Sequence, residues 1–136
     1  MQVVKAEAGL MRQITVIVEN RVGALADVTE VLGANGVNIK SISAQGSGNE
    51  GVIRLITEDE RTAVSALEKA GFKVSVGDVI TIKLRHRPGE LAKVARKLAR
   101  AGVNIECIYQ LSSDRESAEL VLKPDNIENA MRALRA

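Results

Sequence analysis

Two glycines stand where an alternating apolar stretch gives way to a helical pattern, Gly23 in the first half of the chain and Gly89 in the second. Glycine at a strand-to-helix turn lets a ligand approach the backbone closely, and the first N–H groups of the helix can then hold a carboxylate. The alternative interpretation is that the dihedral angles of the turn alone require glycine. On the first interpretation, each turn is a candidate carboxylate site.

Asparagines accompany these turns. Asn20 precedes Gly23 by three positions, and Asn38 and Asn104 each open the strand that follows the helix. An amide side chain both donates and accepts hydrogen bonds, which suits the ammonium and carboxylate groups of an amino acid. We expect Asn20 and Asn38 to converge at one end of the sheet. The alternative is that these asparagines bond to the local backbone.

Residues that carry out catalysis or bind metals are scarce. His86 is the only histidine, flanked by Arg85 and Arg87, and we expect an exposed turn residue there or at most a ligand contact. Cys107 is the only cysteine, which excludes a disulfide framework and a multi-cysteine metal site. The sequence has no Ser/His/Asp set, no His-Glu-x-x-His and no phosphate loop, so we expect neither an enzyme nor a cofactor.

Both turns belong to a stretch that occurs twice. Residues 20–39 (NRVGALADVTEVLGANGVNI) and 86–105 (HRPGELAKVARKLARAGVNI) align without a gap at an offset of 66 positions, with ten identities in twenty positions. Such a repeat fixes the domain count before any other feature of the sequence. The sequence therefore predicts two copies of one small domain, each near the lower size limit for a self-sufficient core.

Periodicity assigns the elements that position the turns. Alternating apolar residues predict strands, and apolar residues at helical spacing predict helices. In the first copy the predicted elements are a strand at 13–19, a helix from the turn to Gly36, strands at 37–44 and 51–57, a helix at 58–70 and a strand at 72–76. In the second copy they are a strand at 78–84, a helix at 90–101, strands at 103–111 and 117–122, and a helix at 125–134.

This order predicts an α+β protein with two ferredoxin-like βαββαβ units in tandem, antiparallel sheets and helices on one face. We expect unit one at 12–77 and unit two at 78–136, with residues 1–11 as an N-terminal extension. Unit two lacks its own C-terminal strand. We expect that edge to be left open, paired with another chain, or filled by a strand at residues 3–6, and one of the last two is favoured because proteins cover open edges.

Composition and charge exclude several classes of function. The formal net charge is +2, too small to indicate nucleic acid, and the basic cluster Lys93, Arg96, Lys97 and Arg100 is typical of a solvated helix face. An RNA-binding sheet of this topology stacks bases on aromatic residues, and Phe72 and Tyr109 are the only ones here. The sequence has neither a signal peptide pattern nor an apolar run of membrane-spanning length. We expect a cytoplasmic protein that binds neither nucleic acid nor a membrane.

The two turns resemble those of a known family. Residues 19–23 (ENRVG) with 36–39 (GVNI), and 87–91 (RPGEL) with 102–105 (GVNI), resemble the ACT domain, and the spacing is similar to that of the serine-sensing regulatory domain of phosphoglycerate dehydrogenase. The resemblance covers residues 12–135 as two tandem units with no catalytic domain attached. It implies a small-molecule sensor in which an amino acid binds between ACT units, at the turn between first strand and first helix.

In the serine-sensing relative the ligand contacts are an Asn in the turn, a His two residues before it and the Asn of GVNI. Asn20 and Asn38 match two of these contacts, but Val18 stands at the His position and Val22 where the family prefers proline. In the second copy Asn104 matches, His86 takes the position of the turn Asn and Leu84 that of the His. Serine specificity is therefore not implied, and we expect the first turn to hold the stronger site.

The resemblance thus implies ligand-binding residues at both turns. In the first copy these are Asn20, Arg21, Val22, Gly23, Ala24, Leu25 and Asn38; in the second they are His86, Arg87, Pro88, Gly89, Glu90, Leu91 and Asn104. The function this implies is a non-catalytic, amino-acid-binding regulatory module that holds its ligand at unit–unit interfaces near the turns. Its expected partners are an amino acid effector, a second copy in a homodimer and a separate regulated enzyme. The alternative is an interaction or oligomerisation scaffold without a physiological ligand.

Overall fold

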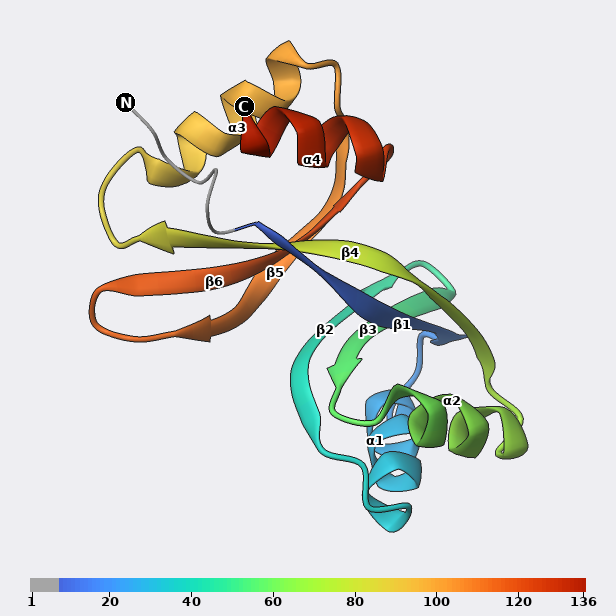
Figure 1. The fold of residues 1–136 in the computed structure, drawn as a ribbon. Coiled ribbons are helices and arrows are strands. Elements are labelled where there is room, and N and C mark those ends of the chain that lie inside the picture. The colour runs from blue at the N-terminus through green and yellow to red at the C-terminus, as the bar shows by residue number, and fades with distance from the viewer. Residues whose placement is uncertain (1–7) are drawn as a thin grey trace. The chain divides into compact units, whose positions relative to one another are not determined.

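The computed structural model describes residues 8–136 and contains strands and helices in the order predicted from the sequence (Figure 1). The elements are β1 (Gly9–Glu19), α1 (Ala24–Ala34), β2 (Ile39–Ser47), β3 (Glu50–Thr57), α2 (Glu60–Lys69), β4 (Lys73–Arg85), α3 (Glu90–Arg100), β5 (Ile105–Ser113), β6 (Ser117–Pro124) and α4 (Ile127–Arg135).

The chain divides into two compact units. The first unit is Arg12–Gly77, and the second unit joins Asp78–Ala136 with the described residues up to Met11. Strands β1 and β4 therefore each contribute residues to both units. The strands predicted at 72–76 and 78–84 are one strand, β4, because the backbone stays extended through Gly77, which lies between them.

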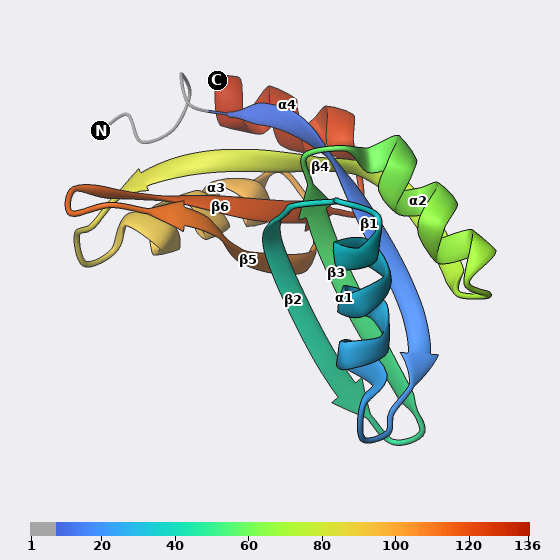
Figure 2. The same cartoon turned by 90° about the horizontal axis from the view of Figure 1, so that it is seen from below.

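The first unit has the strand order β2-β3-β1-β4. Its pairs are antiparallel, with Ile14 opposite Leu55 between β1 and β3 and Ile42 opposite Leu55 between β2 and β3. Helices α1 and α2 contact one another and lie on the same side of these strands (Figures 1 and 2). The core between helices and sheet consists of buried aliphatic side chains: Ile14, Val16, Val28, Leu32, Val37, Ile53, Leu55, Ala63 and Leu67.

In the second unit, β4, β6 and β5 pair antiparallel, with Ile82 opposite Leu120 and Ile108 opposite Leu122. Helices α3 and α4 contact one another, as α1 and α2 do. Their buried side chains form a matching aliphatic core with the strands: Ile80, Ile82, Leu84, Val94, Leu98, Val103, Leu122, Ala130, Met131 and Leu134. The predicted α+β class with antiparallel ferredoxin-like units is confirmed.

The edge of β4 in the second unit is covered by the start of β1. Strand β1 neighbours β4, and a Cβ built on Gly9 would lie 3.3 Å from Thr81 Oγ1. Residues 9–11 thus stand where a C-terminal fourth strand would otherwise lie. The strand predicted at residues 3–6 lies outside the described residues.

Candidate functional site

The first turn joins β1 to α1 through a glycine in the left-handed region. Gly23 has φ 88° and is the N-cap of α1, with no side-chain hydrogen bond capping the helix. The N–H of Ala24 donates to Arg21 O at 3.3 Å, and the N–H of Asp27 donates to Gly23 O at 2.9 Å. The N–H groups of the two residues between them remain at the uncapped helix end, where they can hold an anion.

A hollow of about 170 Å³ opens beside this turn within the first unit. Three elements line it: the end of β1 with the turn, the first residues of α1, and the hairpin of β2 and β3. The lining residues are Val18, Glu19, Asn20, Arg21, Ala24, Leu25, Ala44, Gln45, Gly46, Gly51, Val52 and Ile53. Four of the predicted site residues, Asn20, Arg21, Ala24 and Leu25, therefore share one hollow.

Arg21 lines the hollow and forms an ion pair with Asp27. The Arg21 guanidinium donates to the Asp27 carboxylate in the first turn of α1 and to Val22 O at 3.0 Å. The hydrogen bond to Asp27, with the attraction of its charge, raises the pKa of Arg21 above its ordinary value. Both side chains remain about half exposed, at 46% and 47%, so a ligand can reach both charges.

Asn20 fastens the turn to the β2–β3 hairpin. Its Nδ2 donates to Gly48 O at 2.9 Å, and its backbone N–H donates to Asn49 O at 3.0 Å. The amide lies so close to Gly46 that a Cβ there would be 2.4 Å from Asn20 Oδ1. Glycine at position 46 is therefore required by this contact, and Asn20 already has a structural role without any ligand.

Asn38 lies at the other end of the first unit, which corrects the expectation that Asn20 and Asn38 converge. The N–H of Asn20 donates to Asn49 O, just before β3 begins. Asn38 instead bonds to Glu58, just after β3 ends: its carbonyl accepts from the N–H of Glu58, and its Nδ2 donates to Glu58 Oε1 at 2.9 Å. Asn49 and Glu58 are nine residues apart at the two ends of β3, which corresponds to about 30 Å of extended chain. The expectation fails because α1 carries the chain the length of the sheet before β2 begins.

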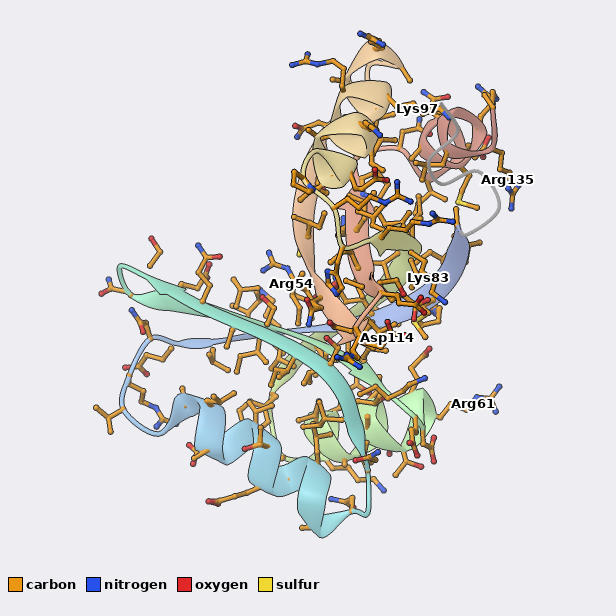
Figure 3. The ribbon with its side chains drawn as sticks, turned by 90° about the vertical axis from the view of Figure 1, so that its left-hand side faces the viewer. Arg54, Arg61, Lys83, Lys97, Asp114 and Arg135 are labelled. Atoms are coloured by element: carbon orange, nitrogen blue, oxygen red, sulfur yellow. The ribbon has the colours of Figure 1, made fainter. Side chains whose placement is uncertain are left out.

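The second turn repeats the backbone of the first. Gly89 has φ 87°, caps α3 without a side-chain hydrogen bond, and accepts from the N–H of Lys93 at 3.0 Å. His86 Nε2 lies 3.0 Å from Asp114 O and 3.2 Å from Ser113 Oγ. Since a carbonyl oxygen only accepts, Nε2 carries the proton in this bond. His86 thus fastens the turn to the β5–β6 loop, where Figure 3 shows Asp114, as Asn20 does in the first unit.

Asp114 also organises its own loop. Its Oδ1 accepts from the N–H groups of Glu116 and Ser117, each at 2.9 Å. These bonds, of which the one from Ser117 has the largest effect, hold the pKa of the Asp114 carboxyl below its ordinary value. The anchor for His86 is therefore a hydrogen-bonded loop with a fixed conformation.

The remaining predicted residues of the second copy fall into two groups. Arg87, Pro88 and Leu91 are exposed at the turn, as Val22 is in the first copy. Glu90 is buried, and its carboxylate accepts from Lys93 Nζ at 3.1 Å. Asn104 lies away from the turn, where its N–H donates to Asp125 Oδ1 at 3.1 Å, so it is placed as Asn38 is.

The sequence did not identify the hairpin as part of the site. Gln45 and Gly46 lie between the strands predicted at 37–44 and 51–57, yet they belong to β2 and, with Gly51 of β3, line the hollow. The available signal was the number of glycines, since a glycine inside a strand marks a close approach of another group. A Cβ on Gly51 would lie 3.0 Å from Val18 Cγ2, which is such an approach.

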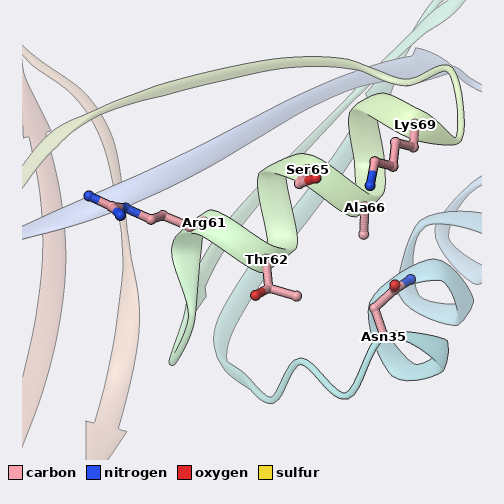
Figure 4. A pocket seen from close by; sticks show the side chains of 6 residues that line it. All are labelled: Asn35, Arg61, Thr62, Ser65, Ala66 and Lys69. Carbon is pink, nitrogen blue, oxygen red and sulfur yellow. The ribbon is translucent and has the colours of Figure 1, made fainter.

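Two further hollows lie on α2, away from both turns. One of about 290 Å³ is lined by Asn35, Arg61, Thr62, Ser65, Ala66 and Lys69 (Figure 4). Another, of about 490 Å³, lies on the same helix between Arg12 and Val76. Neither includes a predicted ligand-binding residue.

Within residues 8–136, no group of three or more His, Cys, Asp and Glu side chains is placed to hold a metal ion. None of the helices in that range combines the length and apolar character that crossing a bilayer requires.

One member of the basic cluster on α3 has a partner within the second unit. Lys97 of α3 donates to the carbonyl oxygen of Ala136 at 2.8 Å, which ties this cation to the end of α4 (Figure 3).

Comparison with known proteins identifies the fold and the family. A crystal structure of a protein from Bacteroides thetaiotaomicron is 32% identical, covers 94% of this chain and 88% of its own, and has a TM-score of 0.85. The ligand-free regulatory subunit of aspartate kinase from Thermus thermophilus is 20% identical, with 93% and 95% of the two chains covered and a TM-score of 0.68. The regulatory subunit from Thermus flavus is also 20% identical, with 96% of each chain covered and a TM-score of 0.65.

At 20% identity, the likeness to the two aspartate kinase subunits shows a shared fold and nothing more. No curated protein matches the sequence. The family model of an ACT domain pair matches residues 10–134 and includes both turns, which confirms the resemblance seen in the repeated stretch. The chain belongs to the ACT domain family, as an ACT domain pair.

Proposed function

We propose that the chain is a non-catalytic regulatory module that binds an amino acid at the first turn. The observation that carries this proposal is the hollow beside Gly23, at an uncapped helix N-terminus, with Arg21, the ion-pair partner of Asp27, in its lining. The likeness in fold to regulatory subunits of aspartate kinase supports a regulatory role. A separate enzyme is then the partner that responds to the bound ligand.

The chemistry of the hollow complements a zwitterion. The helix N-terminus and the Arg21 guanidinium favour a carboxylate, and the carboxylate of Asp27, which pairs with Arg21 next to the lining, favours an ammonium group. Ala24, Val52 and Ile53 give part of the lining an apolar surface for a side chain. The hollow of about 170 Å³ suits a small molecule such as an amino acid.

A second copy of the chain completes the site in this proposal. If Asn20 and Asn38 both contact one ligand, they must come from different units, because within one unit they lie at opposite ends of the sheet. Apolar side chains are exposed near the first turn and on the edge strand β2: Val22 is 98% exposed, Leu25 46% and Ile42 41%. An exposed edge strand with apolar neighbours is a surface that a partner usually covers.

Thermal unfolding of the full chain with each of the twenty amino acids tests the proposal. A ligand at a hundredfold excess over its Kd stabilises by about 2.7 kcal/mol, which raises the Tm by several degrees. We expect at least one amino acid to do this, and Gly23→Val to abolish the response. Lys69→Ala, in the hollow on α2, is the matched control and should respond like the natural chain. If no amino acid raises the Tm, the proposal is wrong.

The competing function is an oligomerisation scaffold without a ligand. It is favoured by the in-chain partners that Asn20 and Asn38 already have, at Gly48 O and Glu58 Oε1. Light scattering distinguishes the two functions. A scaffold keeps the same assembly with every amino acid and after Asn38→Ala, whereas a sensor changes its assembly or its stability when the effector is added.

A further inference from the structure

We propose that Glu90 occupies the second turn as a built-in carboxylate, so that each chain binds a single amino acid, at the first turn. This inference rests on the proposed function and names the residue that decides which of the two turns is used. It makes Ala24 and Glu90 the positions that set the number of ligands per chain.

The backbones of the two turns offer the same cradle. The capping glycines have φ 88° and 87°, and neither helix has a side-chain cap. The residue three positions before each glycine bonds to the facing hairpin, through Asn20 Nδ2 to Gly48 O at 2.9 Å and through His86 Nε2 to Asp114 O at 3.0 Å. A difference in ligand binding therefore has to come from the side chains.

The first helical position carries that difference. Ala24 opens α1, is 9% exposed and lines the hollow. Glu90 opens α3 at the corresponding position and is 8% exposed. Both side chains are buried. Where the first copy has only the methyl group of Ala24, the second copy has the carboxylate of Glu90.

The neighbouring charges are arranged around that carboxylate. In the first copy Arg21 and Asp27 pair at the surface, where both are about half exposed. In the second copy Lys93 takes the position of Asp27 and pairs with Glu90, whose side chain is 10% exposed. The positive end of the α3 dipole also favours this anion. Glu90 is thus a buried carboxylate at the first position of α3 with a cationic partner already in place.

An incoming amino acid meets a like charge at the second turn. Its carboxylate would have to approach Glu90 at the same helix end, and like charges close together destabilise one another. It would also have to separate Glu90 from Lys93 and leave a buried carboxylate unpaired, which is unfavourable. The first turn has no buried carboxylate at that position, because Ala24 carries no charge, and Asp27 is exposed and paired with Arg21.

Equilibrium dialysis of the full chain tests this inference with an equimolar mixture of the twenty amino acids as the probe. The bound amino acids are counted per chain at saturation. We expect one per chain for the natural protein and two for Glu90→Ala. The double variant Ala24→Glu with Asp27→Lys copies the Glu90–Lys93 pair into the first turn, and we expect it to bind none.

The outcomes separate this inference from the proposed function. Two amino acids per natural chain, or a count unchanged at one in Glu90→Ala, overturns the role of Glu90 and leaves the amino acid sensor standing. No binding by the natural chain and by Glu90→Ala overturns the proposed function itself. Circular dichroism confirms that each variant is folded, and the Ala24→Glu, Asp27→Lys arm still decides the question if Glu90→Ala does not fold.

Discussion

The four helices begin in two different ways. Helices α1 and α3 begin at glycines with φ near 88°, and no side chain caps them. Helices α2 and α4 begin at Asp59 and Asn126, whose side chains accept from the N–H groups of Thr62 at 3.1 Å and Asn129 at 2.9 Å. The same contrast occurs in both units, so it belongs to the repeated domain and not to one copy.

This contrast separates helices that complete their own hydrogen bonding from helices that leave it open. An Asp or Asn cap satisfies one of the orphan N–H groups of the first turn, and such residues are the preferred caps. A glycine in the left-handed conformation lets the backbone turn into the helix, but it has no side chain to accept a hydrogen bond from these N–H groups. The starts of α1 and α3 are therefore suited to receive an acceptor from outside, and in the second unit the first helical residue is Glu90, which carries a carboxylate.

Substitution of the capping glycine is expected to have the largest effect on stability. Gly23→Val forces a β-branched residue into the left-handed region, which costs about 1–3 kcal/mol in the free energy of unfolding. Gly33→Ala is the control inside α1, where a Cβ meets nothing within 4 Å, and should stabilise by about 0.5–1 kcal/mol. Urea denaturation measures both. A Gly23→Val chain as stable as the natural one would mean that the turn does not require glycine.

A smaller effect is expected at the capped helices, and it depends on pH. The bonds from the Thr62 hydroxyl and backbone N–H lower the pKa of Asp59 from its ordinary value of 3.8. Because the pKa is lower in the folded chain, the carboxylate stabilises the fold above the unfolded pKa. That contribution is lost as the pH falls through the folded pKa.

Comparison of the natural chain with Asp59→Asn isolates this contribution, since Asn caps a helix without titrating. We expect the natural chain to lose stability relative to Asp59→Asn as the pH falls below 3.8. Asn126→Asp introduces a titrating cap at α4 and should acquire the same dependence. Parallel stability curves for the natural chain and Asp59→Asn over that range would show that the cap bond at α2 contributes nothing.

The fold could be predicted from the sequence because its signals are local and repeated. Apolar residues such as Val28 and Leu32 recur at helical spacing and are buried in the core, and the repeat fixed the two units. The hairpin of β2 and β3 was harder to predict from the sequence. Gly46 lies outside the predicted strands, but it is a strand residue of β2, and the missing side chains of Gly46 and Gly51 make room for Asn20 and Val18.

The positions of the candidate site residues could be predicted in part for a related reason. Spacing identified Gly23 and Asn20 at the turn, because these residues act within a few positions of one another. Spacing could not place Asn38, since the length and direction of α1 decide which end of the sheet it reaches. Nor did the resemblance distinguish Ala24 from Glu90, although both are buried and only Glu90 is charged, which makes the two turns chemically different.

Nitrogen-15 NMR of the full chain tests the central claim most directly, with the equimolar mixture of the twenty amino acids as titrant. The amide signals report each helix start separately. We predict saturable shifts for Gly23 and the first residues of α1, with Thr62 and Asn129 at the capped helices unchanged. Unchanged signals at Gly23, or shifts confined to the α2 hollow around Lys69, would contradict the account.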